Sequence, residues 1–402
     1  MREYQPTKYM SDNIQSADRV FALASNPTWH NKEKPLETLN RENCAAAIGD
    51  IVREPLCIFS GRNKSNQKVY TPVEINGKTM DVIVENWQDD DGSLHQTMIK
   101  TAADTHQVMG MNELWDILDQ AFADCPFEVS CVGTHGNRQN AWISARMIDH
   151  DQFIAGSDNF GEYINILDSR AGLSMLHLVM SAVRTVCANT FGFNVNIAET
   201  IFKKAGLADV AAALVKTEAG FAAKAKHTKN FRANVDAIKA QIPLILGASE
   251  PFIKVYGAMQ AEAVTAEKLR KITLGFFARE TEVNLAKGNV LSTRAINAAN
   301  AVEEMAITGK GNMRESGRVT PTLADLWNGF TQYYTSGNGS GNPENVDPVK
   351  KLINSEFATG ARIKQDSFLA LSDESEIDTL AAMGQKMLDN AIKQKLDMAT
   401  AG

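Results

Sequence analysis

The stretch VYTPVEINGKTMDVIVENW, residues 69–87, decides the fold class of the N-terminal half. At its centre lies Asn76-Gly77, a dipeptide that accepts positive φ at both middle positions of a type I′ turn and is the strongest short signal for a β-hairpin. After the turn, Met80, Val82 and Val84 alternate with the intervening residues, so one face of the second strand is apolar. A further turn precedes residues 94–99. The sequence therefore predicts a three-stranded antiparallel meander made of residues 69–75, 79–87 and 94–99.

Helices and further strands are expected on both sides of this meander. A helix is predicted over residues 39–51, beginning near Thr38 or Asn40 and stopped by Pro55. Over residues 111–123 the apolar side chains follow helical spacing, which predicts an amphipathic helix. Two more strand pairs are predicted, residues 127–132 with 141–148 and residues 163–168 with 175–183.

The second half of the chain is rich in Ala, Lys, Glu and Leu and predicts helices. They are expected at residues 198–205, 208–226, 231–242, 251–263, 266–287, 292–307, 323–334 and 374–399, with a Gly/Ser/Asn-rich linker at 336–343. The predicted fold class is α+β: an antiparallel β-hairpin sheet packed with helices in the N-terminal half, followed by a mostly α-helical C-terminal half. The chain divides into a polar arm (1–35), an α+β sheet domain (36–190), a helical region (191–335), and a linker with a C-terminal helix (336–402).

Composition narrows the classes of function. The 402 residues are 44% hydrophobic and 22% charged, and the formal net charge of −7 gives no global basic field to attract nucleic acid. Five cysteines without a C-x-x-C pair and an N-terminus without an apolar export segment predict reduced thiols in a cytoplasmic, host-cell setting. No stretch is apolar enough to predict a membrane span.

Motifs for catalysis or cofactor binding are missing from the sequence. The seven histidines are far apart, no nucleophile motif is present, and Gly309-Lys310-Gly311 lacks the rest of a phosphate loop. We therefore expect no cofactor, no metal and no enzymatic activity.

Clusters of positive charge are the candidate binding sites. Three groups stand out: Lys224, Lys226, Lys229 and Arg232; Arg138 and Arg146; and Arg62, Lys64 and Lys68 beside the first hairpin. The first group is either a solvated helix surface or a track for phosphates. Basic β-hairpins with adjacent aromatic residues are a common means of holding a single-stranded backbone, although such loops also occur simply as exposed turns.

Arg184 is the sharpest individual candidate. It lies between Val183 and Val186, where an apolar strand is expected to end and a helix to begin, and a charge is unfavourable there unless it is paired or faces a groove. Asn189 and Thr190 follow at polar positions. The alternatives are a buried structural ion pair and contact with a ligand.

Several short motifs occur in a fixed order along most of the chain. They are Trp29-His30, Asn112-Glu113-Leu114-Trp115, the segment Arg184-Thr185-Val186-Cys187-Ala188-Asn189-Thr190, the helix with Trp327, Thr331 and Tyr333, and Phe357-Ala358-Thr359-Gly360-Ala361. Together they resemble a phage- and plasmid-borne family known as a domain of unknown function (DUF932), over about residues 27–371.

The combination of hairpins and helices is also similar, more distantly, to single-strand annealing proteins of the Rad-fifty-two and Red-beta kind. This resemblance implies binding and annealing of single-stranded DNA without turnover, by a homo-oligomer that forms a ring or filament. The nucleic-acid ligands would be Arg184, Asn189, Thr190, Arg138, Arg146, Lys224, Lys226, Lys229 and Arg232. Two alternatives stay open: a phage structural or interaction protein without nucleic-acid activity, and an enzyme whose acids come from residues such as Asp149, Asp151 and Glu162.

Overall fold

The chain forms two compact units, each assembled from stretches that are not consecutive in sequence. The structure, a computed structural model, describes residues 20–23, 34–36, 38–88, 93–102, 106–123, 126–135, 138–148, 152–154, 158–171, 176–184, 189–193, 203, 224–225, 229–239, 249–335 and 359–401. The first unit contains Met1–Asp149, Ile164–Val179 and Phe221–Pro243, and the second contains His150–Tyr163, Met180–Gly220 and Leu244–Gly402. The division of the chain into four consecutive parts stays a prediction.

The first described helix of the first unit is α1 (Arg41–Ile48). Asn40 caps this helix because its side chain accepts from the backbone N–H of Asn43, while the Asn43 side chain accepts from that of Asn40. The helix ends at Gly49, whose φ of 87° and whose position against the carbonyl oxygen of Asn86 leave no room for a side chain. The predicted helix over residues 39–51 is therefore too long, since the chain turns into a strand well before Pro55.

A three-stranded antiparallel sheet follows, with the order β3 (Asp50–Pro55), β8 (Asp81–Gln88), β9 (Leu94–Ala102). Strand β8 lies in the middle, and Val82, Ile83 and Val84 are buried. The pairing of β8 with β9 confirms two strands of the predicted meander. The third strand was assigned wrongly, because β3 and not the segment before Asn76-Gly77 pairs with β8.

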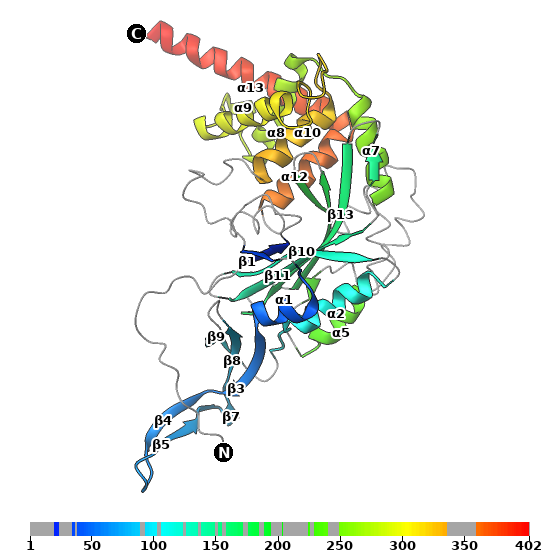
Figure 1. Ribbon diagram of the computed structural model, residues 1–402. Helices are drawn as coiled ribbons and strands as arrows, with labels where there is room; N and C mark the ends of the chain where they lie inside the picture. Colours follow the sequence, from blue (N-terminus) through cyan, green and yellow to red (C-terminus); the bar gives the residue numbers. More distant parts are fainter. Residues whose placement is uncertain are drawn as a thin grey trace. The chain divides into compact units, whose positions relative to one another are not determined.

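Two hairpins interrupt the chain between β3 and β8. Strand β4 (Cys57–Arg62) pairs with β5 (Lys68–Pro72), and β6 (Glu74–Ile75) pairs with β7 (Lys78–Thr79). Asn76 and Gly77 have φ values of 53° and 73°, so the turn predicted from this dipeptide is confirmed. The strands that it joins are only two residues long, because residues 68–72 pair with β4 instead. Figure 1 shows both hairpins as a ribbon that extends from β3 and β8.

A second sheet of the first unit contains β10 (Phe127–His135) and β11 (Asn140–Met147), which pair as expected. Strand β1 (Val20–Leu23) pairs with β10, and β2 (Lys34–Leu36) lies parallel to β1. Both form within or next to the stretch predicted to be a polar arm. Strands β13 (Asp158–Ser169) and β14 (Leu176–Arg184) contribute residues to both units along the chain.

Helices α2 (Met111–Ala121) and α5 (Phe231–Lys239) complete the first unit. Leu114, Ile117 and Leu118 of α2 are fully buried, which confirms the predicted amphipathic stripe. Strand β16 (Lys224–Ala225) pairs with β14, so the helix predicted over residues 208–226 is wrong at this end. The rest of that helix, and the helix predicted at 198–205 apart from Lys203, lie outside the described residues.

The second unit is mainly a helical bundle. Its described helices are α7 (Ser249–Ala261), α8 (Ala266–Glu280), α9 (Thr293–Thr308), α10 (Leu323–Thr335), α12 (Thr359–Leu371) and α13 (Glu374–Ala401), with the short 3₁₀ helix η1 (Leu285–Lys287). Its strands are β12 (Gln152–Ile154), which pairs with the start of β13, and β15 (Asn189–Phe193), which pairs with the end of β14. The predicted α+β fold class is confirmed.

Aromatic side chains fill the centre of this bundle. The rings of Trp327 and Phe368 lie 5.2 Å apart, and Phe252 lies 5.2 Å from Phe368. Asn328 donates through Nδ2 to the hydroxyl oxygen of Tyr256 at 2.9 Å. Helix α10, which carries the motif residues Trp327, Thr331 and Tyr333, is therefore buried in the core. Helix α12, which was not predicted from the sequence, packs against it.

Candidate nucleic-acid interface

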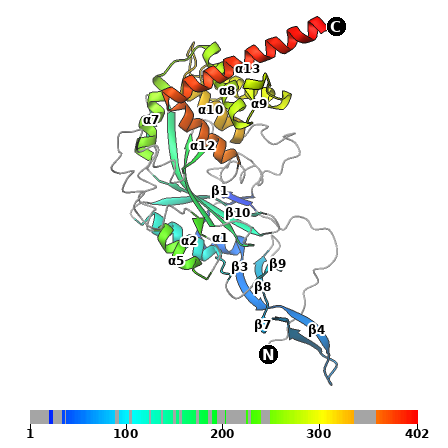
Figure 2. The ribbon, with the colours of Figure 1, turned by 180° about the vertical axis from the view of Figure 1, so that it is seen from behind.

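The two hairpins of residues 57–79 form an exposed element that we call the basic ribbon. Its base is fixed by backbone hydrogen bonds: the N–H of Leu56 donates to Met80 O, and the N–H of Val73 donates to Leu56 O, both at 2.7 Å. The N–H of Met80 donates to Val73 O at 2.8 Å. The ribbon is thus joined to β3 and β8 by a hydrogen-bonded junction and extends from a sheet with a buried central strand (Figure 2).

The strand register places aromatic and cationic side chains on one face of the ribbon. Phe59 lies opposite Tyr70, and Arg62 lies opposite Lys68. Side chains alternate along a strand, and the irregularity between Phe59 and Gly61 returns Arg62 to the face that Phe59 occupies. The Phe59 and Tyr70 rings meet edge to face with their centroids 6.0 Å apart. One aromatic pair therefore lies next to one cationic pair.

The charge of the ribbon is opposite to that of the whole chain. It carries Arg62, Lys64, Lys68 and Lys78 against a single carboxylate, Glu74, on a chain whose formal net charge is −7. Arg62 donates through Nη1 to Asn66 O at 2.7 Å, which holds the loop at the tip. Among the described residues, no carboxylate forms an ion pair with Arg62, Lys64 or Lys68. Like charges that face each other across a ladder are unfavourable, so an anion bound between Arg62 and Lys68 would relieve their repulsion.

Apolar side chains on the ribbon are also exposed. Ile58 is 60% exposed, Phe59 56% and Ile75 53%. Ile58 and Phe59 are successive residues of β4 and point to opposite faces, so of these two only Phe59 adds apolar surface to the face with Arg62 and Lys68. Aromatic rings beside phosphate-binding cations are the combination that holds single-stranded nucleic acid, because each base offers a π-face for stacking and each phosphate a negative charge.

Arg138 is not available as a ligand for nucleic acid, which corrects its assignment as a binding residue. Its side chain is fully buried, and its Nε donates to Glu85 Oε2. Its Nη2 donates to Ile48 O at the end of α1, and its guanidinium lies 4.6 Å from the centre of the Trp87 ring. Arg170, also fully buried, donates from Nη1 to the other oxygen of Glu85. Arg138 therefore joins α1, β8 and the β10–β11 turn, and its role is structural.

The predicted site residues of the central strands are spread over different places. Arg146 lies on β11, half-buried and opposite Glu128 in the register. Arg184, the last residue of β14, pairs with Asn189 of β15, and Val183 pairs with Thr190. The structure thus places Arg184, Asn189 and Thr190 at one end of the β14–β15 pair, although a helix and not a strand was expected after Arg184; their side chains lie outside what it describes.

The helical cluster of cations is divided. Lys224 lies in β16 opposite His177 of β14, and Lys226 lies outside the described residues. Lys229 is exposed just before α5. Arg232 is exposed on α5 and forms an ion pair with Glu113 of α2. The described members do not form one continuous track.

In the part of the chain that the structure describes, no group of three or more His, Cys, Asp or Glu side chains is placed to hold a metal ion. None of the helices described is both long and apolar enough to cross a bilayer.

The ribbon residues were only partly identified from sequence. Arg62, Lys64 and Lys68 were noted as a cationic group, but Phe59 and Tyr70 were not assigned to their face, because the pairing of β4 with β5 was not predicted. The signal was present in the alternation of residues 57–62 and 68–72 around the turn-forming Asn63-Lys64-Ser65-Asn66.

Comparison with known proteins gives a narrow result. Residues 98–203 match the family described as Domain of unknown function (DUF932). This segment runs from β9 through α2, β10, β11, β13 and β14, and it includes Arg184 to Thr190 but neither the basic ribbon nor α10. No curated protein and no solved structure matches the chain. None of these findings supports the resemblance to the Rad-fifty-two and Red-beta annealing proteins.

Proposed function

We propose that this chain binds single-stranded DNA without chemical turnover, through the aromatic and cationic face of the basic ribbon, and promotes annealing of complementary strands in a phage or other mobile element. The observation that carries the proposal is the juxtaposition of the Phe59–Tyr70 pair and the unneutralised Arg62–Lys68 pair on one exposed face. The phage or plasmid setting is part of the proposal, since the family that residues 98–203 match is described only as a domain of unknown function.

The chemistry of such a face follows from its geometry. Arg62, Lys64 and Lys68 would hold phosphates, and the backbone contacts would be independent of sequence. Phe59 and Tyr70 would stack on one or two bases, a contact worth about 1–3 kcal/mol per base. A two-stranded ribbon contacts a strand from one side only. The edges of the remaining bases would therefore stay accessible to a complementary strand.

The experiment is a fluorescence polarisation titration with a labelled mixed-sequence oligonucleotide, single-stranded and as a duplex. The test variant is Arg62→Gln/Lys68→Gln. The control variant, Lys287→Gln/Lys386→Gln, removes the same charge from two exposed lysines of the second unit. We expect the test variant to bind the single strand at least about tenfold more weakly than wild type, since it loses two charge-assisted contacts. The control should bind like wild type.

A second candidate function, a phage structural or interaction protein, uses the same exposed ribbon for protein contacts. It predicts that neither form of the oligonucleotide binds in the micromolar range at low salt. Equal loss of affinity in the test and control variants would also contradict the proposal. It would mean that affinity depends on the net charge of the protein and not on the position of Arg62 and Lys68.

A further inference from the structure

The basic ribbon has a second face, turned away from its aromatic and cationic side chains. In the register of the first hairpin, Ile58 lies opposite Thr71, and Gly61 lies opposite Val69. Side chains alternate along a strand, so these four residues share the face that Phe59 does not occupy. Ile58 is 60% exposed and Val69 39%. We call this surface, made of residues 58, 61, 69 and 71, the back face.

The back face is open and flat at its centre. Gly61 contributes no side chain opposite Val69, and no atom beyond its chain neighbours lies within 4 Å of the place that a Cβ would take. The φ of Gly61 is 139°, a conformation that favours glycine. Ile58 and Val69 are diagonal neighbours across the two strands, so they form one aliphatic surface beside this open place. Such a surface suits a planar apolar ligand.

The charge of the ribbon selects the kind of planar ligand. Arg62 and Lys68 are the chain neighbours of Gly61 and Val69, and the ribbon has an excess of cations over its single carboxylate, Glu74. A ligand on the back face is therefore favoured if it is a polyanion with an exposed apolar plane. The end of a nucleic-acid duplex has both properties, because its last base pair is unstacked on one side and is flanked by two phosphate backbones. Isoleucine is among the apolar side chains that proteins place against base pairs.

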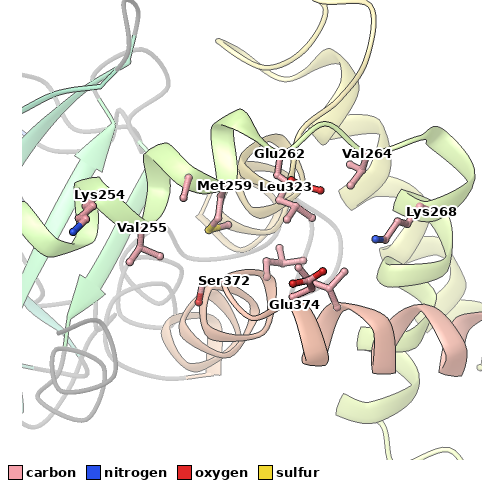
Figure 3. A pocket seen from close by; sticks show the side chains of 12 residues that line it. Lys254, Val255, Met259, Glu262, Val264, Lys268, Leu323, Ser372 and Glu374 are labelled. Carbon is pink, nitrogen blue, oxygen red and sulfur yellow. The ribbon is translucent and has the colours of Figure 1, made fainter. Parts of the chain in front are cut away.

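The pocket of the second unit has no such preference for an anion. It has a volume of about 450 Å³ and lies between α7, the start of α8, and the junction of α12 with α13 (Figure 3). Lys254 and Lys268 line it together with Glu262 and Glu374. Its charges therefore do not distinguish a nucleic acid from other ligands, unlike those of the ribbon.

We infer that the ribbon binds the junction between a single strand and a duplex, with the single strand on the face of Phe59 and Tyr70 and the last base pair on the back face. The inference rests on the proposed function and names the preferred substrate of the same site. One layer of backbone separates the two faces, so a strand that leaves the duplex end passes directly from the back face to the aromatic one. Such a junction forms as soon as two complementary strands begin to pair, and the ribbon holds its growing end.

The test compares labelled probes by fluorescence polarisation at low salt: a single strand, a duplex with a single-stranded tail of the same sequence, and a blunt duplex. The tailed duplex is made in both polarities, and the tighter binder is used. The back-face variant Ile58→Thr/Val69→Thr keeps β-branched side chains, and circular dichroism checks that it folds. The control variant Leu94→Thr/Val319→Thr makes a comparable change at residues that are 81% and 95% exposed outside the ribbon.

Wild type should bind the tailed duplex about tenfold more tightly than the single strand, because the base pair covers the two aliphatic side chains of the back face. The back-face variant should lose this preference and bind the single strand like wild type. Neither substitution changes a charge, so this loss is independent of the additional phosphates of the duplex. The control variant should keep the preference. The blunt duplex should bind more weakly than the tailed one, because it offers no strand to the aromatic face.

The outcomes separate this inference from the proposed function. Binding of the single strand without a preference for the tailed duplex would overturn the inference alone and would leave the back face to a protein partner. A back-face variant that keeps the preference, or a control variant that loses it, would also overturn the inference. Absence of binding to all probes would overturn the proposed function as well.

Discussion

Replacing Glu85 with glutamine should destabilise the first unit more than most single substitutions. Glu85 is fully buried on β8, and its two carboxylate oxygens accept from Arg138 and Arg170, which are fully buried as well. Glutamine keeps the size of the side chain but removes the only negative charge that the described ion pairs place between these two guanidinium groups. Loss of one partner from a buried ion pair costs about 3–5 kcal/mol, because the remaining charge stays in a medium of low dielectric constant.

The assay is urea unfolding followed by circular dichroism, with the free energy of unfolding taken from the midpoint and slope. The matched control is Glu113→Gln, which neutralises the carboxylate of the Arg232–Glu113 pair. The Arg232 side chain is 65% exposed and that of Glu113 30%. An exposed pair contributes about 0–1 kcal/mol, so the control should change little. The double variant Glu85→Gln/Arg138→Met should lose less than the sum of its single changes. A loss below about 1 kcal/mol in Glu85→Gln would refute this account of the cluster.

Three other perturbations have defined outcomes. Phe59→Ala should weaken binding of single-stranded DNA by about tenfold, because it removes one stacking contact, while the urea midpoint stays near that of wild type, because Phe59 is 56% exposed. Unchanged affinity would remove stacking from the proposal. Gly384→Ala should lower the free energy of unfolding by about 1–3 kcal/mol, because a Cβ there would lie 1.9 Å from Lys271 O of α8. This loss is expected despite the higher helix propensity of alanine. The control is Ala382→Ser at an exposed position, and a gain in stability from Gly384→Ala would contradict the close approach of α8 and α13. Burial raises the pKa of the Cys44 thiol from 9.0 to about 12, so the folded state binds the thiol proton more tightly than the unfolded state does. The stability that comes from this difference is present below pH 9 and is lost as the pH rises toward 12. Iodoacetamide at pH 8 should therefore modify the exposed Cys57 and spare Cys44, as mass spectrometry of tryptic peptides would show, and equal labelling would contradict the burial.

Elements with strong local signals were predicted well from sequence. The turn at Asn76-Gly77, the helix from Met111 and the β10–β11 pair all depend on neighbouring residues, and the structure confirms each of them. The partner of β8 was predicted wrongly because a strand can pair with any segment of suitable pattern, and β3 lies some thirty residues away along the chain. Helix α12 was not predicted, because which of its residues are buried depends on its packing against α10, a contact that is distant in the sequence.

The candidate site was less predictable than the fold. The sequence singles out cations, but it does not indicate which ones are buried. Arg138 and Arg62 lie in similar turn-rich surroundings, yet Arg138 is fully buried against Glu85 whereas Arg62 is exposed on the ribbon. The difference comes from long-range contacts with α1 and β8, which no local pattern encodes.

The central claim, that the basic ribbon holds phosphates of a single strand, is tested most directly by the salt dependence of binding. For single strands, the slope of log K against log salt concentration is about −0.7 for each phosphate contact. Removing the charges of Arg62, Lys64 and Lys68 with glutamine should make the slope shallower by about 2, whereas the control Lys287→Gln/Lys386→Gln should leave it unchanged. An identical slope in wild type and the triple variant would contradict the account.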